Sequence, residues 1–347
     1  MIRVGIVGVG FMGWIHWLAY QKVAGVRVAA ISTRNAQRRA GDWRGIQGNF
    51  GPPGEQVDLA GVAAHADLDE LLADPQIDLV DITLPTSLHA DVAIRALAAG
   101  KHVLCEKPMA LRLADCRRMV AAAKKANRLL MIGHVLPFFP EYDWALKTIR
   151  GGEYGGLRGG AFRRVIANPT WLESFWSPEQ IGGPMLDLHV HDAHFIRLVF
   201  GMPNEVVTAG RSRNGLPEFW HSQFRFAEKD LVVEATSGTI DQQGRAFTHG
   251  YEIHLERATL AFDFAVIGGD GKYLCEPMLL NNDGGVQRPE LPGGDAIDAF
   301  TSELREVVRS IRDGQTSEIL GALLAQDAMR ICERQAVSLE RGRLVKM

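Results

Sequence analysis

Short apolar runs alternate with amphipathic stretches over the first 133 residues of the chain. Five of these runs end at glycine or polar residues and predict buried strands: 2–9, 26–31, 77–83, 102–105 and 129–133. Amphipathic stretches between them predict helices: 12–23, 67–73, 87–99 and 114–126. A polar, glycine-rich stretch at 34–60 predicts one helix followed by a long loop. This alternation predicts a parallel sheet with helices on both faces.

The pattern changes after about residue 134. Several runs of half-exposed, alternating character predict strands: 157–167, 204–213, 219–227, 230–240, 249–256, 258–267 and 272–279. Helical periodicity appears in four stretches: 142–150, 186–200, 295–313 and 317–338. We therefore expect an α/β chain of two domains, 1–133 and 134–347, the second an α+β domain with a large, mostly antiparallel sheet. The closing helix, 317–338, is a candidate to pack back on the first domain.

Composition narrows the class of protein. The chain has 347 residues, 46% hydrophobic and 23% charged, which is ordinary for a globular protein of two domains. A net charge of -3 provides no overall attraction to nucleic acid or anionic membranes. The four cysteines lie far apart without a CxxC pair, which favours a reducing compartment over a disulfide framework or zinc ribbon. Without a signal-peptide pattern or a membrane-spanning apolar run, we expect a cytoplasmic protein with no nucleic-acid or membrane partner.

A glycine fingerprint follows the first predicted strand and opens the first predicted helix. Its residues are Gly8, Val9, Gly10, Phe11, Met12 and Gly13, a GxGxxG run. Gly8 permits a tight turn, Gly10 lets the backbone approach a pyrophosphate, and Gly13 allows close packing of helix on strand. The alternative is a tight turn without a ligand. The strand, turn and helix context favours a Rossmann dinucleotide-binding domain, with Phe11 and Met12 in contact with the cofactor.

The end of the second predicted strand bears on the choice of cofactor. An NAD enzyme usually places an acidic residue there, on the adenosine ribose. This chain instead has Ser32, Thr33 and Arg34, with Arg38 one turn later. Hydroxyl and guanidinium groups suit a 2′-phosphate, so the run favours NADP(H) over NAD(H). The alternative is that the arginines form a solvated helix start and discriminate little.

The run 83–109 reads TLPTSLHADVAIRALAAGKHVLCEKPM. It resembles the TP-x-x-x-H … AGKHVL-x-EKP signature of the Gfo/Idh/MocA oxidoreductases, which include glucose–fructose oxidoreductase and inositol dehydrogenase. The resemblance continues in the runs 133–134, 141–156 and 182–192 and from Ala299 to the end of the chain. It implies a Rossmann domain and an open-faced α/β domain whose sheet often mediates oligomerisation, and hence a homo-oligomer, dimer or tetramer. It also implies hydride transfer between a nicotinamide cofactor and a sugar, polyol or related compound.

Lys107 is the first candidate catalytic residue. It lies in the run Glu106-Lys107-Pro108, just past the carboxyl end of a predicted parallel strand, where such sheets bind ligands. An ammonium there can orient a substrate hydroxyl and stabilise a developing alkoxide. The alternative is a surface ion pair between Lys107 and Glu106. The resemblance implies that Lys107 positions substrate and cofactor.

Asp187 and His191 are the second candidate pair. Their i, i+4 spacing places both side chains on one face of a helix. A histidine on such a face can take a hydroxyl proton while the neighbouring carboxylate stabilises its charged form. The resemblance places Asp187 and His191 at the catalytic Asp and His of the family. His189 and His194 depart from many relatives, and we expect them to shape the pocket or satisfy buried hydrogen bonds rather than bind a metal.

Further candidates surround these residues. Thr83 and Pro85 close the third predicted strand, and His89 starts the next helix. The resemblance implies that this run lies along the cofactor, where Glu106 is also expected. Four residues upstream of the catalytic helix suit carbohydrate recognition through aromatic stacking and polar contacts: Arg163, Asn168, Trp171 and Trp176. They are equally compatible with a sheet surface or a subunit contact.

Three functions are therefore weighed. The leading one is an NAD(P)-dependent oxidoreductase acting on a CH–OH group or its ketone. The second is a redox-neutral enzyme that cleaves glycosides by transient oxidation with a retained cofactor. The third is a sensor of nucleotide and sugar without activity, which the joint presence of Lys107, Asp187 and His191 disfavours.

Overall fold

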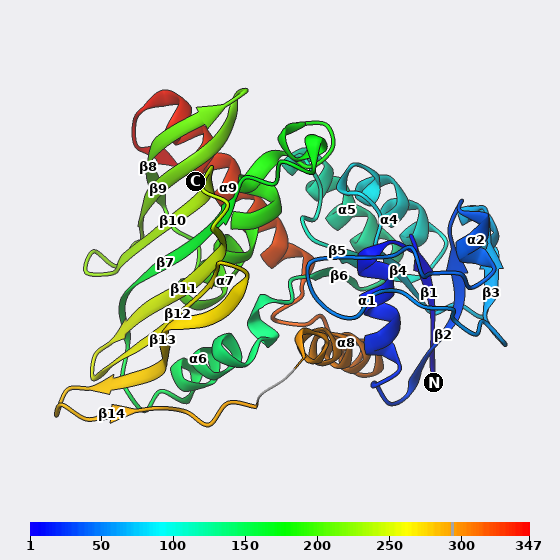
Figure 1. Ribbon diagram of the computed structural model, residues 1–347, viewed down its shortest axis with the longest axis horizontal. Helices are drawn as coiled ribbons and strands as arrows, with labels where there is room; N and C mark the ends of the chain where they lie inside the picture. Colours follow the sequence, from blue (N-terminus) through cyan, green and yellow to red (C-terminus); the bar gives the residue numbers. More distant parts are fainter. Residues whose placement is uncertain (293–294) are drawn as a thin grey trace. The chain divides into compact units, whose positions relative to one another are not determined.

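The computed structural model describes residues 1–292 and 295–347, which divide into two compact units (Figure 1). Unit 1 comprises Met1–Phe139 and Gly293–Gln326, and unit 2 comprises Pro140–Pro292 and Asp327–Met347. The domain boundary that the sequence predicts places the helix 295–313 in the second domain, but the structure places it in unit 1. Its apolar face, including Phe300 and Leu304, belongs to the hydrophobic core of unit 1.

Unit 1 contains a six-stranded sheet with the order β3-β2-β1-β4-β5-β6. Its strands are β1 (Ile2–Val7), β2 (Val26–Ser32), β3 (Ala63–His65), β4 (Leu79–Ile82), β5 (His102–Glu106) and β6 (Leu130–Gly133). All neighbours pair in parallel, as the alternating pattern predicts. The strand order reverses between β1 and β4, which is where open sheets of this kind bind ligands at their carboxyl edge. Only β3, three residues long, was not expected.

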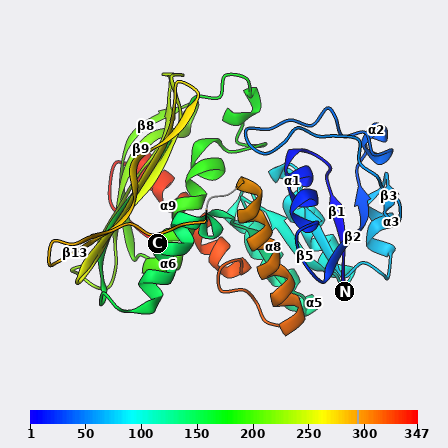
Figure 2. The same ribbon diagram turned by 60° about the horizontal axis from the view of Figure 1, so that its bottom comes forward.

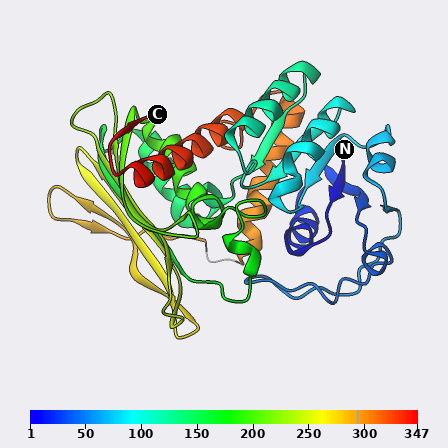
Figure 3. The same ribbon diagram turned by 90° about the horizontal axis from the view of Figure 1, so that it is seen from above.

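Helices lie on both faces of this sheet, with α1 and α8 on one face and α4 and α5 on the other (Figures 1 and 3). The helices of unit 1 are α1 (Phe11–Tyr20), α2 (Ala36–Arg39), α3 (Leu68–Ala73), α4 (His89–Ala98), α5 (Leu113–Ala126) and α8 (Ala296–Asp313), with short 3₁₀ turns η1 (Thr86–Leu88) and η2 (Leu136–Phe138). The Phe300 ring of α8 lies 5.9 Å from the His16 ring of α1, which joins the two helices.

Unit 2 contains a nine-stranded sheet with the order β14-β13-β12-β11-β7-β10-β9-β8-β15. Its strands are β7 (Leu157–Ala167), β8 (Glu205–Arg213), β9 (Leu216–Arg225), β10 (Val232–Ile240), β11 (Arg245–Leu255), β12 (Ala258–Ile267), β13 (Asp270–Asn281), β14 (Val286–Gln287) and β15 (Val345–Lys346). Neighbours are antiparallel except β10 and β7. The expected mostly antiparallel sheet is confirmed.

The helices of unit 2 lie along one face of this sheet (Figure 2). They are α6 (Pro140–Gly151), α7 (Val190–Phe200) and the part of α9 (Ala322–Arg341) that follows Gln326, with the turns η3 (Glu173–Trp176) and η4 (Met185–His189). Contacts confirm the packing, since Tyr251 of β11 donates to the Glu141 carbonyl and the Ser338 hydroxyl accepts from the Thr208 amide. Among residues 1–292 and 295–347, none of the helices is long and apolar enough to cross a membrane.

Candidate cofactor and catalytic residues

The glycine turn of unit 1 is shaped by contacts that leave no room for larger residues. Gly8 has φ 98°, a left-handed conformation that glycine adopts readily, and its amide donates to the Ser32 carbonyl at 2.9 Å. A Cβ on Gly13 would lie 2.3 Å from the Gly8 carbonyl oxygen. Gly8 and Gly13 therefore allow α1 to pack tightly beneath the end of β1.

Gly10 differs from these two glycines. It is the N-cap of α1, and a Cβ placed on it would meet no atom within 4 Å. The backbone amides of Phe11 and Met12 begin the helix beside this open space. A helix N-terminus that lacks a side-chain cap and has open space before it fits the pyrophosphate of a dinucleotide.

The residues expected at the adenosine end lie after β2. Ser32 is buried, Thr33 is half-buried, and Arg34 is exposed. The Arg38 guanidinium donates from Nη1 to the Val9 carbonyl at 2.6 Å, which holds it against the glycine turn. The structure thus places Arg38 beside the glycine fingerprint and leaves Arg34 open to solvent.

The side chains of Thr83 and His89 are buried and form hydrogen bonds with backbone carbonyls of neighbouring loops. The Thr83 hydroxyl donates to the Gly8 carbonyl at 2.5 Å. His89 is buried, with Nδ1 2.9 Å from the Pro108 carbonyl and Nε2 2.8 Å from the Leu84 carbonyl. Burial lowers the pKa of His89. The His89 ring thus connects the loops that contain Leu84 and Pro108 inside unit 1, and its contact with the cofactor stays a prediction.

Pro85 is exposed to solvent, whereas Glu106 is buried. Pro85 precedes η1 and is exposed, so it remains a candidate for the cofactor wall. Glu106 ends β5, is buried, and accepts the Lys107 amide at 3.0 Å through Oε2. Its other oxygen lies 3.1 Å from His16 Nε2. Both oxygens of the Glu106 carboxylate therefore contact groups of the protein, and its place along the cofactor stays a prediction.

His16 and Asp81 were not found by sequence reasoning. His16 Nδ1 lies 2.8 Å from Asp81 Oδ2, and both side chains are fully buried. Burial opposes a charge on the ring, but the carboxylates of Asp81 and Glu106 outweigh it and raise the pKa of His16 well above its ordinary value. A signal was present in the sequence, since Asp81 is an acidic residue inside an apolar strand.

Asp187 and His191 lie in unit 2 on two different kinds of helix. Asp187 belongs to η4, a π-helical turn, whereas His191 is the second residue of α7. The single α-helix expected over 186–200 is therefore wrong at its first turn. A π turn spaces side chains differently from an α-helix and is frequent at functional sites. Both residues are half-buried.

A buried ion pair anchors the start of α7 to the sheet. Arg164 of β7 donates from Nε and Nη2 to the two carboxylate oxygens of Asp192, at 2.8 and 3.0 Å. Burial opposes the charge on Arg164, but Asp192 outweighs it and raises the pKa of the guanidinium. Because Asp192 follows His191 directly, this pair holds the backbone that carries the candidate base.

His189 serves the core of unit 2. Its Nδ1 lies 2.8 Å from the Ser237 hydroxyl and its Nε2 lies 3.0 Å from the Gln335 amide oxygen. Its ring packs edge-on against Trp220, and burial lowers its pKa. The expectation of buried hydrogen bonds is confirmed for His189, and His194 is likewise fully buried.

Three of the four carbohydrate candidates have other contacts. Arg163 pairs with Asp263 of β12 and, by strand alternation, faces away from the side on which Arg164 meets α7. Its contact with substrate stays a prediction, but its charge is already paired on the other face of the sheet from Arg164. The Asn168 amide oxygen accepts a hydrogen bond from Trp176 Nε1 at 3.0 Å, so these two polar groups are partners within the protein.

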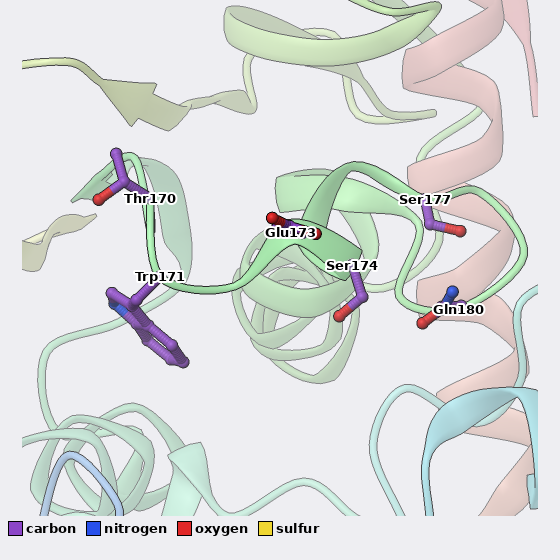
Figure 4. A pocket seen from close by; sticks show the side chains of 6 residues that line it. All are labelled: Thr170, Trp171, Glu173, Ser174, Ser177 and Gln180. Carbon is purple, nitrogen blue, oxygen red and sulfur yellow. The ribbon is translucent and has the colours of Figure 1, made fainter.

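Trp171 is the remaining candidate. It is 75% exposed and lines an open pocket of about 610 Å³ in the segment between β7 and η4 (Figure 4). The other lining residues are polar: Thr170, Glu173, Ser174, Ser177 and Gln180. An exposed indole among hydroxyl, amide and carboxylate groups has the chemistry of a sugar-binding surface.

Comparison with known proteins agrees with this geometry. Residues 2–134 match the oxidoreductase family with an NAD-binding Rossmann fold, and residues 142–261 match the GFO/IDH/MocA C-terminal domain. The chain is 34% identical over 197 residues to a 1,5-anhydro-D-fructose reductase of Ensifer adhaerens, a match that spans 50% of this chain and only 59% of the reductase. It is 28% identical to a myo-inositol 2-dehydrogenase of Thermotoga maritima, over 98% of this chain and 99% of that protein.

The fold is shared with a levoglucosan dehydrogenase solved in complex with NADH and levoglucosan. The TM-score is 0.79, with 20% identity, and the alignment covers 99% of both chains. Both halves of the chain thus match domains of one family in the same order, and the glycine turn has the open space that a dinucleotide needs. The chain belongs to the Gfo/Idh/MocA oxidoreductases, with an N-terminal NAD-binding Rossmann domain.

Proposed function

We propose that the chain is a nicotinamide-dependent dehydrogenase or reductase acting on a hydroxyl or keto group of a sugar, polyol or related compound. The observation that carries the proposal is the position of Lys107. It directly follows β5 at the carboxyl edge of a parallel sheet whose glycine turn fits a dinucleotide. The names of two relatives, an anhydrofructose reductase and an inositol dehydrogenase, support this substrate class.

The proposed roles follow from the chemistry of each side chain. When bound, the nicotinamide accepts or supplies a hydride. In the direction of oxidation, His191 takes the hydroxyl proton as the C–H hydride leaves the same carbon and the C=O bond forms. Asp187 stabilises the charged imidazole, and the Lys107 ammonium donates to the substrate oxygen as negative charge develops. In reduction the same proton returns from His191 to the oxygen.

NADP(H) is the proposed cofactor. Support comes from the exposed Arg34 and from Arg38, which is held beside the glycine turn by its bond to the Val9 carbonyl. Guanidinium groups bind a 2′-phosphate through charge-assisted hydrogen bonds. We expect Arg34→Ala to lower the affinity for NADPH about tenfold while changing that for NADH little. Arg27→Ala is the matched control, because Arg27 is exposed near the amino end of the same strand.

The activity test is a panel of sugars, polyols and anhydrosugars, including levoglucosan and myo-inositol, supplied with NADP⁺ and NAD⁺ separately. Nicotinamide reduction is followed by absorbance. His191→Ala is expected to lower kcat/KM by about 10²–10⁴. The control is His221→Ala, since His221 is half-exposed on β9. Unchanged turnover in His191→Ala would exclude His191 as the base.

The panel also separates net oxidation from redox-neutral chemistry. Cleavage of a glycoside without net nicotinamide reduction, by protein that retains its cofactor through purification, would establish the redox-neutral reaction. Cofactor binding without conversion of any compound would instead favour a sensor.

A further inference from the structure

The His16 imidazole bridges two buried carboxylates. His16 Nδ1 lies 2.8 Å from Asp81 Oδ2 and His16 Nε2 lies 3.1 Å from Glu106 Oε1. A neutral imidazole carries one N–H, so it can donate to only one of these oxygens and would turn a lone pair toward the other. Both contacts are favourable when each ring nitrogen carries a proton. The geometry therefore indicates an imidazolium between two carboxylates, in agreement with the raised pKa of His16.

A third acid lies beside this bridge. Glu303 of α8 is fully buried, and neither of its oxygens has a hydrogen-bond partner among the residues that the structure describes. Burial, reinforced by the negative charge of Glu106, raises the pKa of Glu303 well above its ordinary value. The raised pKa of Glu303 favours its protonated form, and Asp81 and Glu106 are the carboxylates that contact His16.

The bridge reaches the candidate catalytic turn through Glu106. While Oε1 contacts His16, Oε2 accepts the Lys107 amide at 3.0 Å. A Cβ on Gly133 of the neighbouring strand would lie only 3.2 Å from Glu106 Oε1, so that side of the carboxylate is closely packed. Both oxygens of Glu106 are therefore fixed, one by His16 and the other by the backbone of Lys107.

We propose that His16 is a positioning residue, which holds the Glu106 carboxylate and thereby the Glu106-Lys107-Pro108 turn that presents the Lys107 ammonium. The proposal rests on the catalytic role of Lys107 proposed above. His16 lies on α1, two residues after Trp14 and one turn beyond the glycine fingerprint. Helix α1 therefore begins at the glycine fingerprint and, through His16, supports the Glu106-Lys107-Pro108 turn.

Hydrogen exchange tests the positioning directly and needs no substrate. In His16→Gln, one amide NH2 group and one carbonyl oxygen replace the two ring N–H groups, so the side chain cannot donate in both of the directions in which Asp81 and Glu106 lie. We therefore expect at least tenfold faster exchange of the Lys107 amide. The effect is read from peptides that span residues 103–110, by mass spectrometry of the full chain. His65→Gln is the matched control, since His65 pairs with the exposed Glu70 at 3.3 Å elsewhere in unit 1. Unchanged exchange in His16→Gln would overturn the proposal.

Kinetics then test whether His16 acts through Lys107. With the panel compound that the enzyme turns over, His16→Gln is expected to lower kcat at least tenfold and to change the Kd of NADPH less than threefold. In a Lys107→Met background, His16→Gln should lower the residual rate no further. Independent, multiplicative losses would show that His16 does not act through Lys107. If Lys107→Met alone keeps full turnover, the proposed function fails at Lys107, while the exchange result still decides whether His16 holds the turn.

A second variant covers the case in which His16→Gln does not fold. Glu106→Gln keeps the shape of the side chain but has one acceptor oxygen in place of two, so it cannot serve both His16 and the Lys107 amide. It is expected to accelerate the same exchange and to lower kcat. A folded Glu106→Gln protein with normal exchange and normal kcat would overturn the proposal independently.

Discussion

Arg164 and Asp192 form a two-point ion pair in the interior of unit 2, where their side chains are 5% and 1% exposed. The neighbouring Arg163 points to the other face of the sheet and pairs with Asp263, with 40% of its side chain exposed. Two consecutive arginines of one strand therefore lie in different environments, one buried and one partly exposed, because successive side chains alternate between the faces of a sheet.

This difference predicts unequal effects on stability. Arg164→Met leaves the Asp192 carboxylate buried without its cation and is expected to lower the free energy of unfolding by about 3–5 kcal/mol. Arg163→Met removes a partly exposed pair and is expected to cost about 1 kcal/mol or less. Chemical denaturation of both variants measures the two values. Equal losses would contradict the assignment of the two arginines to opposite faces.

At Gly10 of the glycine fingerprint, a substitution is expected to weaken nucleotide binding without changing the stability of the fold. Gly10→Ala adds a methyl group to open space at a backbone conformation that alanine tolerates, so the midpoint of thermal unfolding should hardly change. The methyl group would occupy the space expected for the pyrophosphate, and the Kd of NADPH should rise at least about tenfold, or 1.4 kcal/mol. Titration of nucleotide fluorescence measures the affinity.

Gly13→Ala is the contrasting variant. Its Cβ would lie 2.3 Å from the Gly8 carbonyl oxygen, so α1 must shift and both stability and binding should fall. A Gly10→Ala protein that binds NADPH normally would show that the dinucleotide does not approach this glycine.

Replacing the buried acid Glu303 with glutamine is expected to stabilise the protein by an amount that depends on pH. Its pKa in the folded chain is raised above the ordinary value of 4.5, mainly by burial and then by Glu106. The native state therefore holds this proton more tightly, and the stability it contributes is lost as the pH rises through the folded pKa. Glu303→Gln mimics the protonated acid, so its advantage in Tm over the parent should grow as the pH is raised.

Scanning calorimetry between pH 5 and 9 measures this difference. Asp298→Asn is the control on the same helix, because Asp298 is exposed and pairs with Lys22. A gap in Tm between Glu303→Gln and the parent that stays constant with pH would show that Glu303 is ionised in the native state.

The exposed indole of Trp171 predicts an effect on substrate binding without an effect on folding. Trp171→Ala removes a side chain that is 75% exposed and should change the free energy of unfolding by about 0.5 kcal/mol or less. If the pocket in Figure 4 takes part in sugar binding, KM should rise severalfold at constant kcat. Trp176→Ala, which loses the hydrogen bond to Asn168, should instead reduce stability. Unchanged KM in Trp171→Ala would remove Trp171 from the substrate site.

Local patterns in the sequence were sufficient to predict most of the fold. The apolar strands and the GxGxxG run at 8–13 predicted a parallel dinucleotide-binding sheet, because both signals depend on neighbouring residues. Alternation in the second half predicted the large sheet for the same reason. Where the backbone departs from regular geometry, as in the π turn that carries Asp187, periodicity predicted an ordinary helix instead.

The bridge from Asp81 through His16 to Glu106 could not be predicted from the sequence. Its two contacts join residues 65 and 90 positions apart, and Glu303 comes from a helix still further along the chain. The packing of α8 in unit 1 depends likewise on contacts between distant segments. Strands, helices and the glycine turn are predictable from the sequence, since they follow from local periodicity and neighbouring residues. The pairing of buried charges depends on the tertiary fold. Local sequence patterns carry no information about which distant side chains contact one another in the low-dielectric interior.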